Sequence, residues 1–111
     1  MEITTKQYKH CDLLSIQGKV DSYTAPDLSK AIEMLNHDGQ FKIVFDMGEL
    51  EYMSSAGFRA LLIGQRNCKR YNRGEMILAA VPKRITEALE LTGFTPLFRI
   101  FDDVTAAVGS F

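Results

Sequence analysis

The sequence predicts an α/β fold: a mostly parallel sheet of four or five strands combined with helices, in the order ββαβαβαβα. Short runs of β-branched and apolar residues alternate along the chain with segments in which apolar residues recur at helical spacing. Strands that alternate with helices are joined by right-handed crossovers, which make neighbouring strands parallel. The length of 111 residues corresponds to one domain, taken as residues 1–111.

Three strands are predicted in the first half of the chain. Residues 2–8 and 11–20 are rich in β-branched and apolar residues, and only Lys9-His10 separates them. Such a short interruption indicates two antiparallel strands, with the first at an edge of the sheet. Residues 41–46 (FKIVFD) form a nearly continuous apolar run. A run of this kind is typical of a central strand that is covered on both faces.

The first helix is expected to begin at Thr24 and to end near residues 36–39. Thr24 is the expected N-cap residue, Pro26 lies in the first turn, and Asp27 completes a pair that is similar to a capping box. After the central strand, residues 47–53 are expected to form a loop. Residues 54–57 (SSAG) then open a long helix.

That second helix is predicted to reach about Asn72 and to be ended by Gly74. Residues 76–81 (MILAAV) form the next buried strand. Pro82 begins a third helix that Gly93 closes. A last short strand is expected at residues 97–101, followed by a final helix that is capped by Asp102 and has an inward face of Val104, Ala107, Val108 and Phe111.

Composition excludes several classes of protein. Thirteen Lys and Arg residues against 14 Asp and Glu residues leave a net charge of −1, whereas a nucleic-acid-binding protein needs a basic face. We therefore expect no direct nucleic-acid binding, and no membrane association because no apolar stretch is long enough. No nucleotide-binding, metal-binding or hydrolase motif is present, so no cofactor, metal or catalytic residue is expected. The two distant cysteines, Cys11 and Cys68, and an N-terminus without a signal peptide predict a cytoplasmic protein.

Two serines stand where binding sites collect in α/β proteins. In open α/β sheets, ligands bind beyond the carboxyl ends of the strands, at the helix N-termini. Ser54 and Ser55 occupy that position after the central strand, and the small residues Ala56 and Gly57 follow them. One interpretation is a tandem N-cap with no further role. The other interpretation is a functional serine. Only one serine is needed as the cap, so the hydroxyl of the second is free.

A basic stripe is predicted on the second helix. Arg59, Arg66, Arg70 and Arg73 share one narrow stripe, opposite a face formed by Leu61, Gly64, Cys68 and Tyr71. A solvated helix face explains such a stripe. Leu62 and Ile63 lie beside it, however, and apolar residues next to a basic stripe are typical of a surface that binds a partner.

Three parts of the sequence resemble the STAS domains of bacterial anti-sigma factor antagonists. Residues 43–62 (IVFDMGELEYMSSAGFRALL) are similar to the strand, loop and helix of that family. Residues 18–25 (GKVDSYTA) resemble its G-x-[LIV]-D-x-x-[ST]-A segment, and residues 74–81 (GEMILAAV) with residues 89–94 (LELTGF) resemble its later strand and helix. The resemblance covers nearly the whole chain and implies the same single α/β domain.

The resemblance implies a non-enzymatic protein switch. Unphosphorylated members of the family bind an anti-sigma factor, often a serine kinase with a histidine-kinase-like ATP fold, and so free a sigma factor. The kinase then phosphorylates the serine two residues before the glycine, which is Ser55 here, and a metal-dependent serine phosphatase reverses the step. The acid that often precedes the acceptor is replaced by Ser54, which is a minor alternative acceptor. The expected partner-binding residues are Asp21, Thr24, Ser54, Ser55, Ala56, Gly57, Arg59, Leu62 and Ile63.

Two other functions remain open from the sequence. The first is a constitutive STAS scaffold without a phosphorylation switch, which the missing acid before Ser55 favours. The second is a small enzyme or nucleotide-binding protein that uses the crevice at the strand ends. The acids nearest to Ser55 in the sequence, Glu49 and Glu51, fall in the expected loop, so this second function lacks a general base. A monomer is expected.

Overall fold

The computed structural model describes residues 1–111 and has one five-stranded sheet with helices on both faces. The strands follow one another across the sheet in their order along the chain. The first strand pairs antiparallel with the second, and all later neighbours are parallel, which confirms the predicted α/β fold. The strands are β1 (Glu2–Gln7), β2 (Asp12–Val20), β3 (Lys42–Met53), β4 (Glu75–Ala79) and β5 (Ile100–Phe101).

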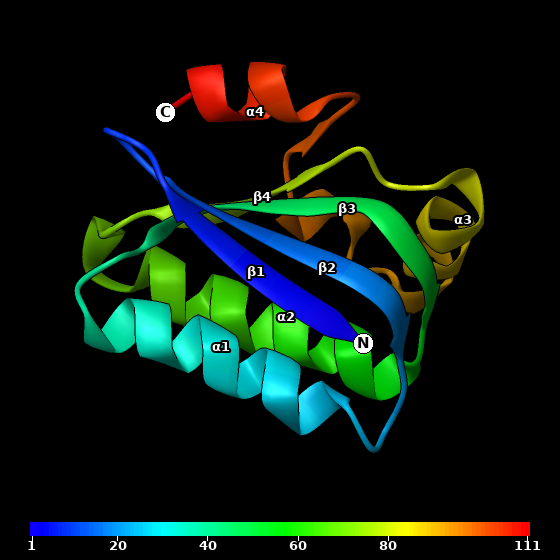
Figure 1. Cartoon of the computed structure of the whole chain (residues 1–111). Helices are drawn as coiled ribbons and strands as arrows, with labels where there is room; N and C mark the ends of the chain where they lie inside the picture. Colours follow the sequence, from blue (N-terminus) through cyan, green and yellow to red (C-terminus); the bar gives the residue numbers. More distant parts are fainter.

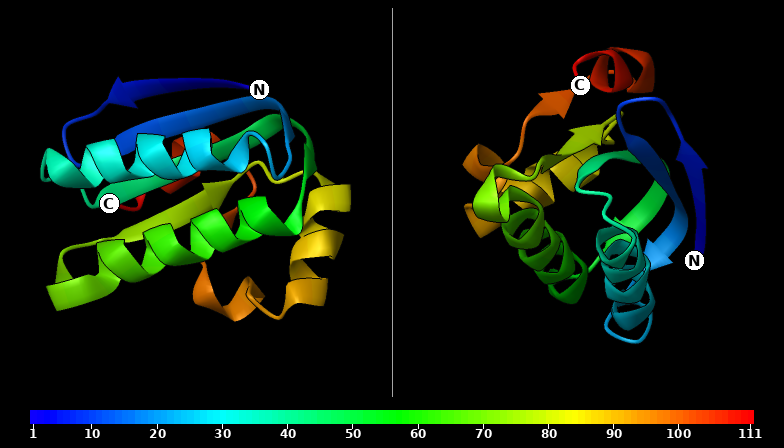
Figure 2. Two further views of the ribbon diagram at one scale, coloured as in Figure 1. Left: turned by 90° about the horizontal axis from the view of Figure 1, so that it is seen from below. Right: turned by 90° about the vertical axis from the view of Figure 1, so that its left-hand side faces the viewer.

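Four α-helices surround the sheet (Figure 1). Two of them lie side by side along one face, the last lies across the opposite face, and the third stands at the end of the sheet where β3 finishes (Figure 2). None is both long and apolar enough to cross a membrane. The helices are α1 (Ala25–His37), α2 (Ser55–Lys69), α3 (Lys83–Thr92) and α4 (Val104–Gly109).

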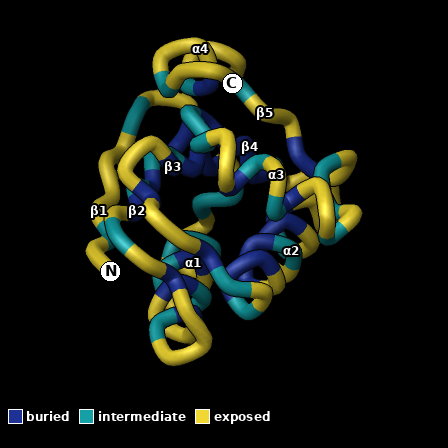
Figure 3. The backbone as a smooth tube through the Cα atoms, turned by 90° about the vertical axis from the view of Figure 1, so that its right-hand side faces the viewer, coloured by how far each residue is buried: buried dark blue, intermediate teal, exposed yellow.

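The main core lies between the sheet and the pair α1 and α2. Phe45 from β3 is fully buried there, together with Leu28 and Ile32 from α1 and Leu61 from α2. A smaller cluster lies on the other face, where Ala107 of α4 covers apolar side chains of β3 and β4. The central strands are therefore buried on both faces, as their continuous apolar sequences predict, while β1 and the helix surfaces stay exposed (Figure 3).

The expected loop at residues 47–53 is wrong, because β3 continues through this segment to Met53. The extended part pairs with β2 through two register shifts, and its last pair joins Val20 to Met53. Leu50 and Met53 point into the core, whereas Glu49 and Glu51 are exposed. The polar residues that suggested a loop are the solvent face of a bulged strand.

The predicted end of the second helix is also wrong, because α2 stops at Lys69 and a short 3₁₀ turn follows at Arg70–Asn72. Tyr71 has a φ of 58° and is 81% exposed, so it does not belong to the buried face of the helix. Arg73 leaves the predicted stripe and folds back. Its guanidinium donates to the carbonyls of Asn67 and Arg70, 2.6 and 3.0 Å away, and stacks 3.8 Å from the Phe41 ring centroid. These bonds satisfy carbonyls at the helix end.

The C-terminal elements differ from expectation only in their bounds. The strand expected at residues 97–101 is a 3₁₀ turn at Thr95–Leu97 followed by the two-residue β5. The cap of α4 is Asp103 rather than Asp102, because the Asp103 carboxylate accepts a hydrogen bond from the Ala106 N–H at 2.7 Å. Gly93 ends α3 with a φ of 77°, as predicted.

Candidate functional site

Ser54 and Ser55 divide the two roles that the sequence left open. Ser54 has extended backbone angles, and its hydroxyl accepts a hydrogen bond from the Gly57 N–H at 3.4 Å, so Ser54 is the N-cap residue of α2. Ser55 is the first helical residue and is exposed to solvent. Because the cap is supplied by Ser54, the Ser55 hydroxyl is not used for capping and remains accessible.

The close approach of α2 to the strand ends explains the glycine at position 57. A Cβ atom on Gly57 would lie 2.6 Å from Met53 Cγ and 2.9 Å from Val20 Cγ1, which is closer than real contacts allow. The Ser54 N–H also donates to the Val20 carbonyl at 2.8 Å. The start of α2 is therefore fixed directly against the ends of β2 and β3.

A tight turn after β2 is organised by Asp21 and Thr24. The Asp21 carboxylate accepts hydrogen bonds from the N–H groups of Tyr23 and Thr24, at 3.0 and 2.9 Å, and the Thr24 hydroxyl accepts one from the Asp21 N–H at 2.9 Å. The Thr24 hydroxyl also donates to the Asp21 carboxylate at 3.1 Å. The bonds that the carboxylate accepts from the Thr24 N–H and the Thr24 hydroxyl hold the pKa of Asp21 below its ordinary value. Thr24 precedes α1 as predicted, but its side chain does not cap the helix, so the expected pair with Asp27 is wrong.

The turn and the start of α2 lie next to each other. Val20 immediately precedes Asp21, and its carbonyl binds Ser54. An open groove of about 560 Å³ continues from this point, with Ser22, Ala25, Pro26 and Ser29 on the α1 side and Ala56 on the α2 side. The structure therefore brings together the predicted residues of the turn, Asp21 and Thr24, and those of the helix start.

The remaining predicted residues extend this surface along α2. Arg59 is exposed one turn after Ser55, Leu62 is half-buried, and Ile63 is 45% exposed. Two exposed tyrosines were not among the residues predicted from the sequence. Tyr23 lies in the Asp21–Thr24 turn with 89% of its surface exposed, and Tyr52 lies one residue before the end of β3. An aromatic residue within a polar turn is the sequence signal that could have identified Tyr23.

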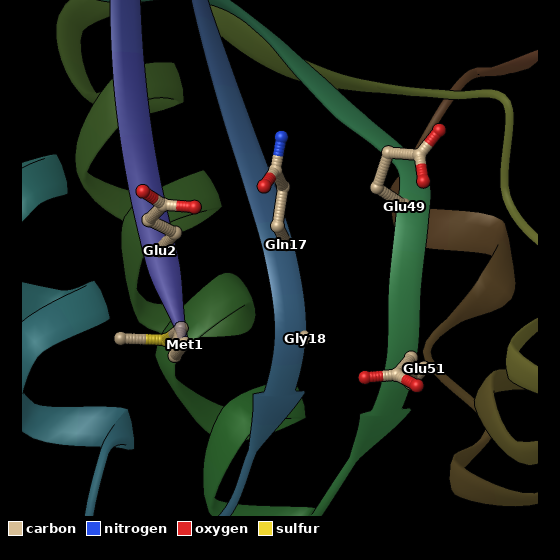
Figure 4. A pocket seen from close by; sticks show the side chains of 6 residues that line it. All are labelled: Met1, Glu2, Gln17, Gly18, Glu49 and Glu51. Carbon is tan, nitrogen blue, oxygen red and sulfur yellow. The ribbon is translucent and has the colours of Figure 1, made fainter.

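The acids of β3 belong to another face of the sheet. Glu49 and Glu51 line an open surface together with Glu2, Gln17 and Gly18 from β1 and β2 (Figure 4). The two histidines are also away from the start of α2. His10 is in the turn between β1 and β2, and His37 is the last residue of α1, at the other end of that helix from the Asp21–Thr24 turn.

Comparison with protein families identifies the fold family. The family model of the STAS domain matches residues 2–107 of the sequence. The chain belongs to the STAS domain family. Among curated STAS relatives, BtrV of Bordetella bronchiseptica, described as a candidate anti-sigma factor antagonist, is 28% identical over 111 residues, covering all of this chain and 95% of BtrV. The anti-sigma-B factor antagonist of Listeria monocytogenes is 27% identical over 100 residues, covering 90% of this chain and 86% of the relative.

Solved STAS structures share the whole fold. An anti-sigma factor antagonist from Mycobacterium paratuberculosis superposes with a TM-score of 0.87 at 21% identity, covering 98% of this chain and 92% of that chain. The phosphorylated form of the Bacillus cell fate determinant SpoIIAA gives a TM-score of 0.76 at 14% identity, covering 98% of each chain. The family and the strand and helix order read from the sequence are thus confirmed.

Proposed function

We propose that this STAS domain is an anti-sigma factor antagonist that works as a phosphorylation-controlled binding switch. In the unphosphorylated state it binds an anti-sigma factor that is also a serine kinase with a histidine-kinase-like ATP fold. Phosphorylation of Ser55 ends the binding, and a metal-dependent serine phosphatase restores it. The observation that carries the proposal is the division of roles between the two serines, since Ser54 caps the helix and Ser55 is exposed in its first turn.

The names of the relatives support the same function. BtrV and the Listeria protein are described as anti-sigma factor antagonists, and both align with most of this chain. SpoIIAA, which shares the fold, exists in a phosphorylated form. A function in protein binding rather than catalysis also agrees with the surroundings of Ser55, where neither histidine of the chain is placed.

Electrostatics explain how the domain can accept the phosphate. A phosphoserine adds about 1.5 to 2 negative charges, and the N-terminus of a helix is the place where negative charge is best tolerated. Arg59 lies one turn after Ser55 on the exposed side of α2, and its guanidinium can pair with the phosphate. The phosphate therefore changes the surface and leaves the fold intact.

Loss of binding then arises at the interface. The proposed contact surface combines the turn after β2 with the first two turns of α2, and a hydrated dianion in its middle prevents close packing of the partner. Leu62 and Ile63 supply apolar area at its border. The proposed contact residues are Asp21, Thr24, Ser54, Ser55, Ala56, Arg59, Leu62 and Ile63. Gly57, which the sequence placed among them, is buried against Met53 and Val20, so it shapes the start of α2 without touching a partner.

A constitutive interaction domain is the second candidate. The observation in its favour is Ser54, which stands where many antagonists have an acid before the acceptor. Ser54 itself is a poor acceptor because its hydroxyl is bonded to the Gly57 N–H. A constitutive domain would bind its partner equally well with or without a charge at Ser55.

A capture experiment separates the two candidates. Wild-type protein and the Ser55→Asp variant are used as baits in lysate of the source organism, and captured proteins are identified by mass spectrometry. Ser110→Asp, which adds the same charge on the opposite face at the end of α4, is the matched control. We expect a histidine-kinase-like ATPase on the wild-type and Ser110→Asp baits and its loss from Ser55→Asp.

The captured ATPase also permits a direct test of the acceptor. Incubation with ATP should add one phosphate to the wild-type chain at Ser55 and none to Ser55→Ala. Equal capture by all three baits supports the constitutive domain, and phosphate on Ser54 in the wild type contradicts the assignment of Ser55.

A further inference from the structure

The first strand leaves one edge of the sheet open. β1 pairs only with β2, and in the right-hand view of Figure 2 it is the outermost strand. Five of its six residues are exposed, and Ile3 alone is partly buried. The opposite edge is formed by β5, which has only two residues. An open edge strand presents unpaired main-chain donors and acceptors to any other strand that can align with it.

The hairpin geometry shows which main-chain groups are free. The Tyr8 N–H donates to the Cys11 carbonyl at 2.8 Å, which closes the turn between β1 and β2 with a hydrogen-bonded pair. In antiparallel strands such pairs alternate with pairs that are not hydrogen-bonded. Thr4 and its neighbours at positions 2 and 6 therefore bond to β2. The N–H and C=O groups of Ile3 and Thr5 point away from the sheet.

The side chains of β1 carry a pattern that is complementary to itself. One face of β1 carries every second residue, namely Glu2, Thr4 and Lys6. Figure 4 shows Glu2 on this face beside Gln17 of β2. When this strand is turned antiparallel to a copy of itself about Thr4, each Glu2 stands opposite a Lys6. Ile3 and Thr5 then stand opposite each other, so the free main-chain groups of the two copies meet.

We propose that a second copy of this chain pairs with the β1 edge, antiparallel and centred on Thr4. Two five-stranded sheets join into one continuous sheet, with main-chain hydrogen bonds between Ile3 and Thr5 of the two copies. Glu2 and Lys6 form two symmetric ion pairs on its surface. Glu2 and the partner's Lys6 stand opposite each other in a pair that is not hydrogen-bonded. Side chains of such a pair lie closer together than those of a hydrogen-bonded pair.

Charge complementarity identifies the occupant as a second copy. A strand without this arrangement leaves a charge of β1 opposite a neutral or like-charged residue, which destabilises a cross-strand pair. In a two-fold symmetric dimer every contact occurs twice, so Glu2 and Lys6 of each copy both stand opposite a residue of opposite charge. The edge contains none of the residues around Ser55, so the dimer presents two copies of the proposed contact surface.

The expected dimer is weak. A single pair of edge strands buries less than the roughly 1,200 Å² of a stable interface. We expect a dissociation constant of about 10⁻⁴ M, which makes the protein a monomer when dilute and a dimer when concentrated. This dimer does not depend on the proposed function. It replaces the monomer that the sequence predicts with a monomer–dimer equilibrium.

Charge reversal gives a specific test by sedimentation equilibrium over a wide concentration range. Lys6→Glu and Glu2→Lys each place two like charges opposite each other, and each alone should weaken the dimer by about tenfold. An equimolar mixture of the two variants restores both ion pairs, so the mixture should associate as the wild type does. Lys30→Glu, on the exposed surface of α1, makes the same charge change away from the edge and should have no effect.

Thr5→Pro tests the main-chain part of the proposal. Its N–H points away from β2, so proline at this position removes a donor of the dimer without breaking the hairpin ladder. We expect loss of the dimer with an unchanged circular-dichroism spectrum. A wild-type protein that stays monomeric at the highest concentrations overturns the proposal. Association that persists unchanged in Lys6→Glu, or a mixture of variants that fails to associate, overturns it as well.

Discussion

The side chain of Gln65 takes the place of a neighbouring strand for Met76. Its Oε1 atom accepts a hydrogen bond from the Met76 N–H at 2.7 Å, and its Nε2 atom donates to the Met76 carbonyl at 3.1 Å. The same Nε2 atom donates to the Leu97 carbonyl at 2.7 Å. β4 needs this partner because β5 is paired only with Leu78 and Ala79. A helix residue thereby completes the hydrogen bonding of the sheet.

Replacement of Gln65 by leucine should strongly destabilise the fold. Leucine fills a similar volume but leaves the buried main-chain groups of Met76 and Leu97 without partners, at a cost of about 2–4 kcal/mol in the free energy of unfolding. Urea unfolding measures the change. Gln17→Leu, at an exposed position of β2, is the control and should change the stability little. A Gln65→Leu variant as stable as the wild type would falsify the role of these three bonds.

The two serines should differ in their contribution to stability. Ser54→Ala removes the cap of α2 and should lower the free energy of unfolding by about 1 kcal/mol. Ser55→Ala removes an exposed hydroxyl that takes no part in the cap, so its effect should be close to zero. Thermal and chemical unfolding of both variants provide the comparison. A larger loss of stability in Ser55→Ala than in Ser54→Ala would show that Ser55, and not Ser54, caps α2.

Asp21 should make the stability depend on pH in the acidic range. Its pKa in the folded protein lies below the ordinary value of 3.8, first because the Thr24 N–H binds the ionised carboxylate and then because the Thr24 hydroxyl does so. A carboxyl of this kind stabilises the fold above its unfolded pKa, and the contribution is lost as the pH falls through the folded pKa. Asp21→Asn should therefore be less stable than the wild type at pH 7.

The difference between Asp21→Asn and the wild type should shrink as the pH falls below about 4, where the wild-type carboxyl also loses its charge. Melting temperatures from pH 7 to strongly acidic conditions test this. Glu33→Gln, an exposed acid in the middle of α1, serves as the reference for a general charge effect. A difference that stays constant with pH would show that hydrogen bonding alone, without the charge, stabilises the turn.

Gly57→Ala should destabilise the start of α2 although alanine favours helices. The added methyl group meets Met53 and Val20 at distances that force one of them to move, and we expect a loss of about 1–3 kcal/mol. At Gly109, by contrast, an added Cβ meets nothing within 4 Å. Gly109→Ala should be nearly neutral, and equal effects of the two substitutions in urea unfolding would contradict the close packing at Gly57.

Hydrophobic periodicity predicted the class of fold and the number and order of its regular elements, because both depend on which face of each segment is apolar. The end of β3 escaped prediction. Glu49 and Glu51 make the segment look like a loop, and the bulges that turn them to solvent depend on pairing with β2. The end of α2 escaped it for a related reason. The chain leaves the helix after Lys69 through positive φ angles at Tyr71 and Asn72, and Arg73 then bonds back to the Asn67 carbonyl.

The candidate site was predictable in its position and not in its chemistry. A serine pair after a central strand is typical of a helix start, and family resemblance singles out Ser55. Which serine is the cap depends on the direction of the Gly57 N–H, a property of the folded backbone. Thr24 does not form the expected capping pair with Asp27 and bonds instead to Asp21 within the turn before α1. This choice of partner depends on backbone angles as well.

The hydrogen bond from the Ser54 N–H to the Val20 carbonyl has a consequence for the speed of exchange between partners. It fixes both halves of the proposed contact surface to adjacent strand ends, so the surface is already ordered before a partner arrives. Association with an ordered surface loses little conformational entropy. Among related complexes of such a surface, differences in affinity appear mainly in the dissociation rate. A charge at Ser55 should therefore act by shortening the lifetime of the complex, while the rate of encounter changes far less.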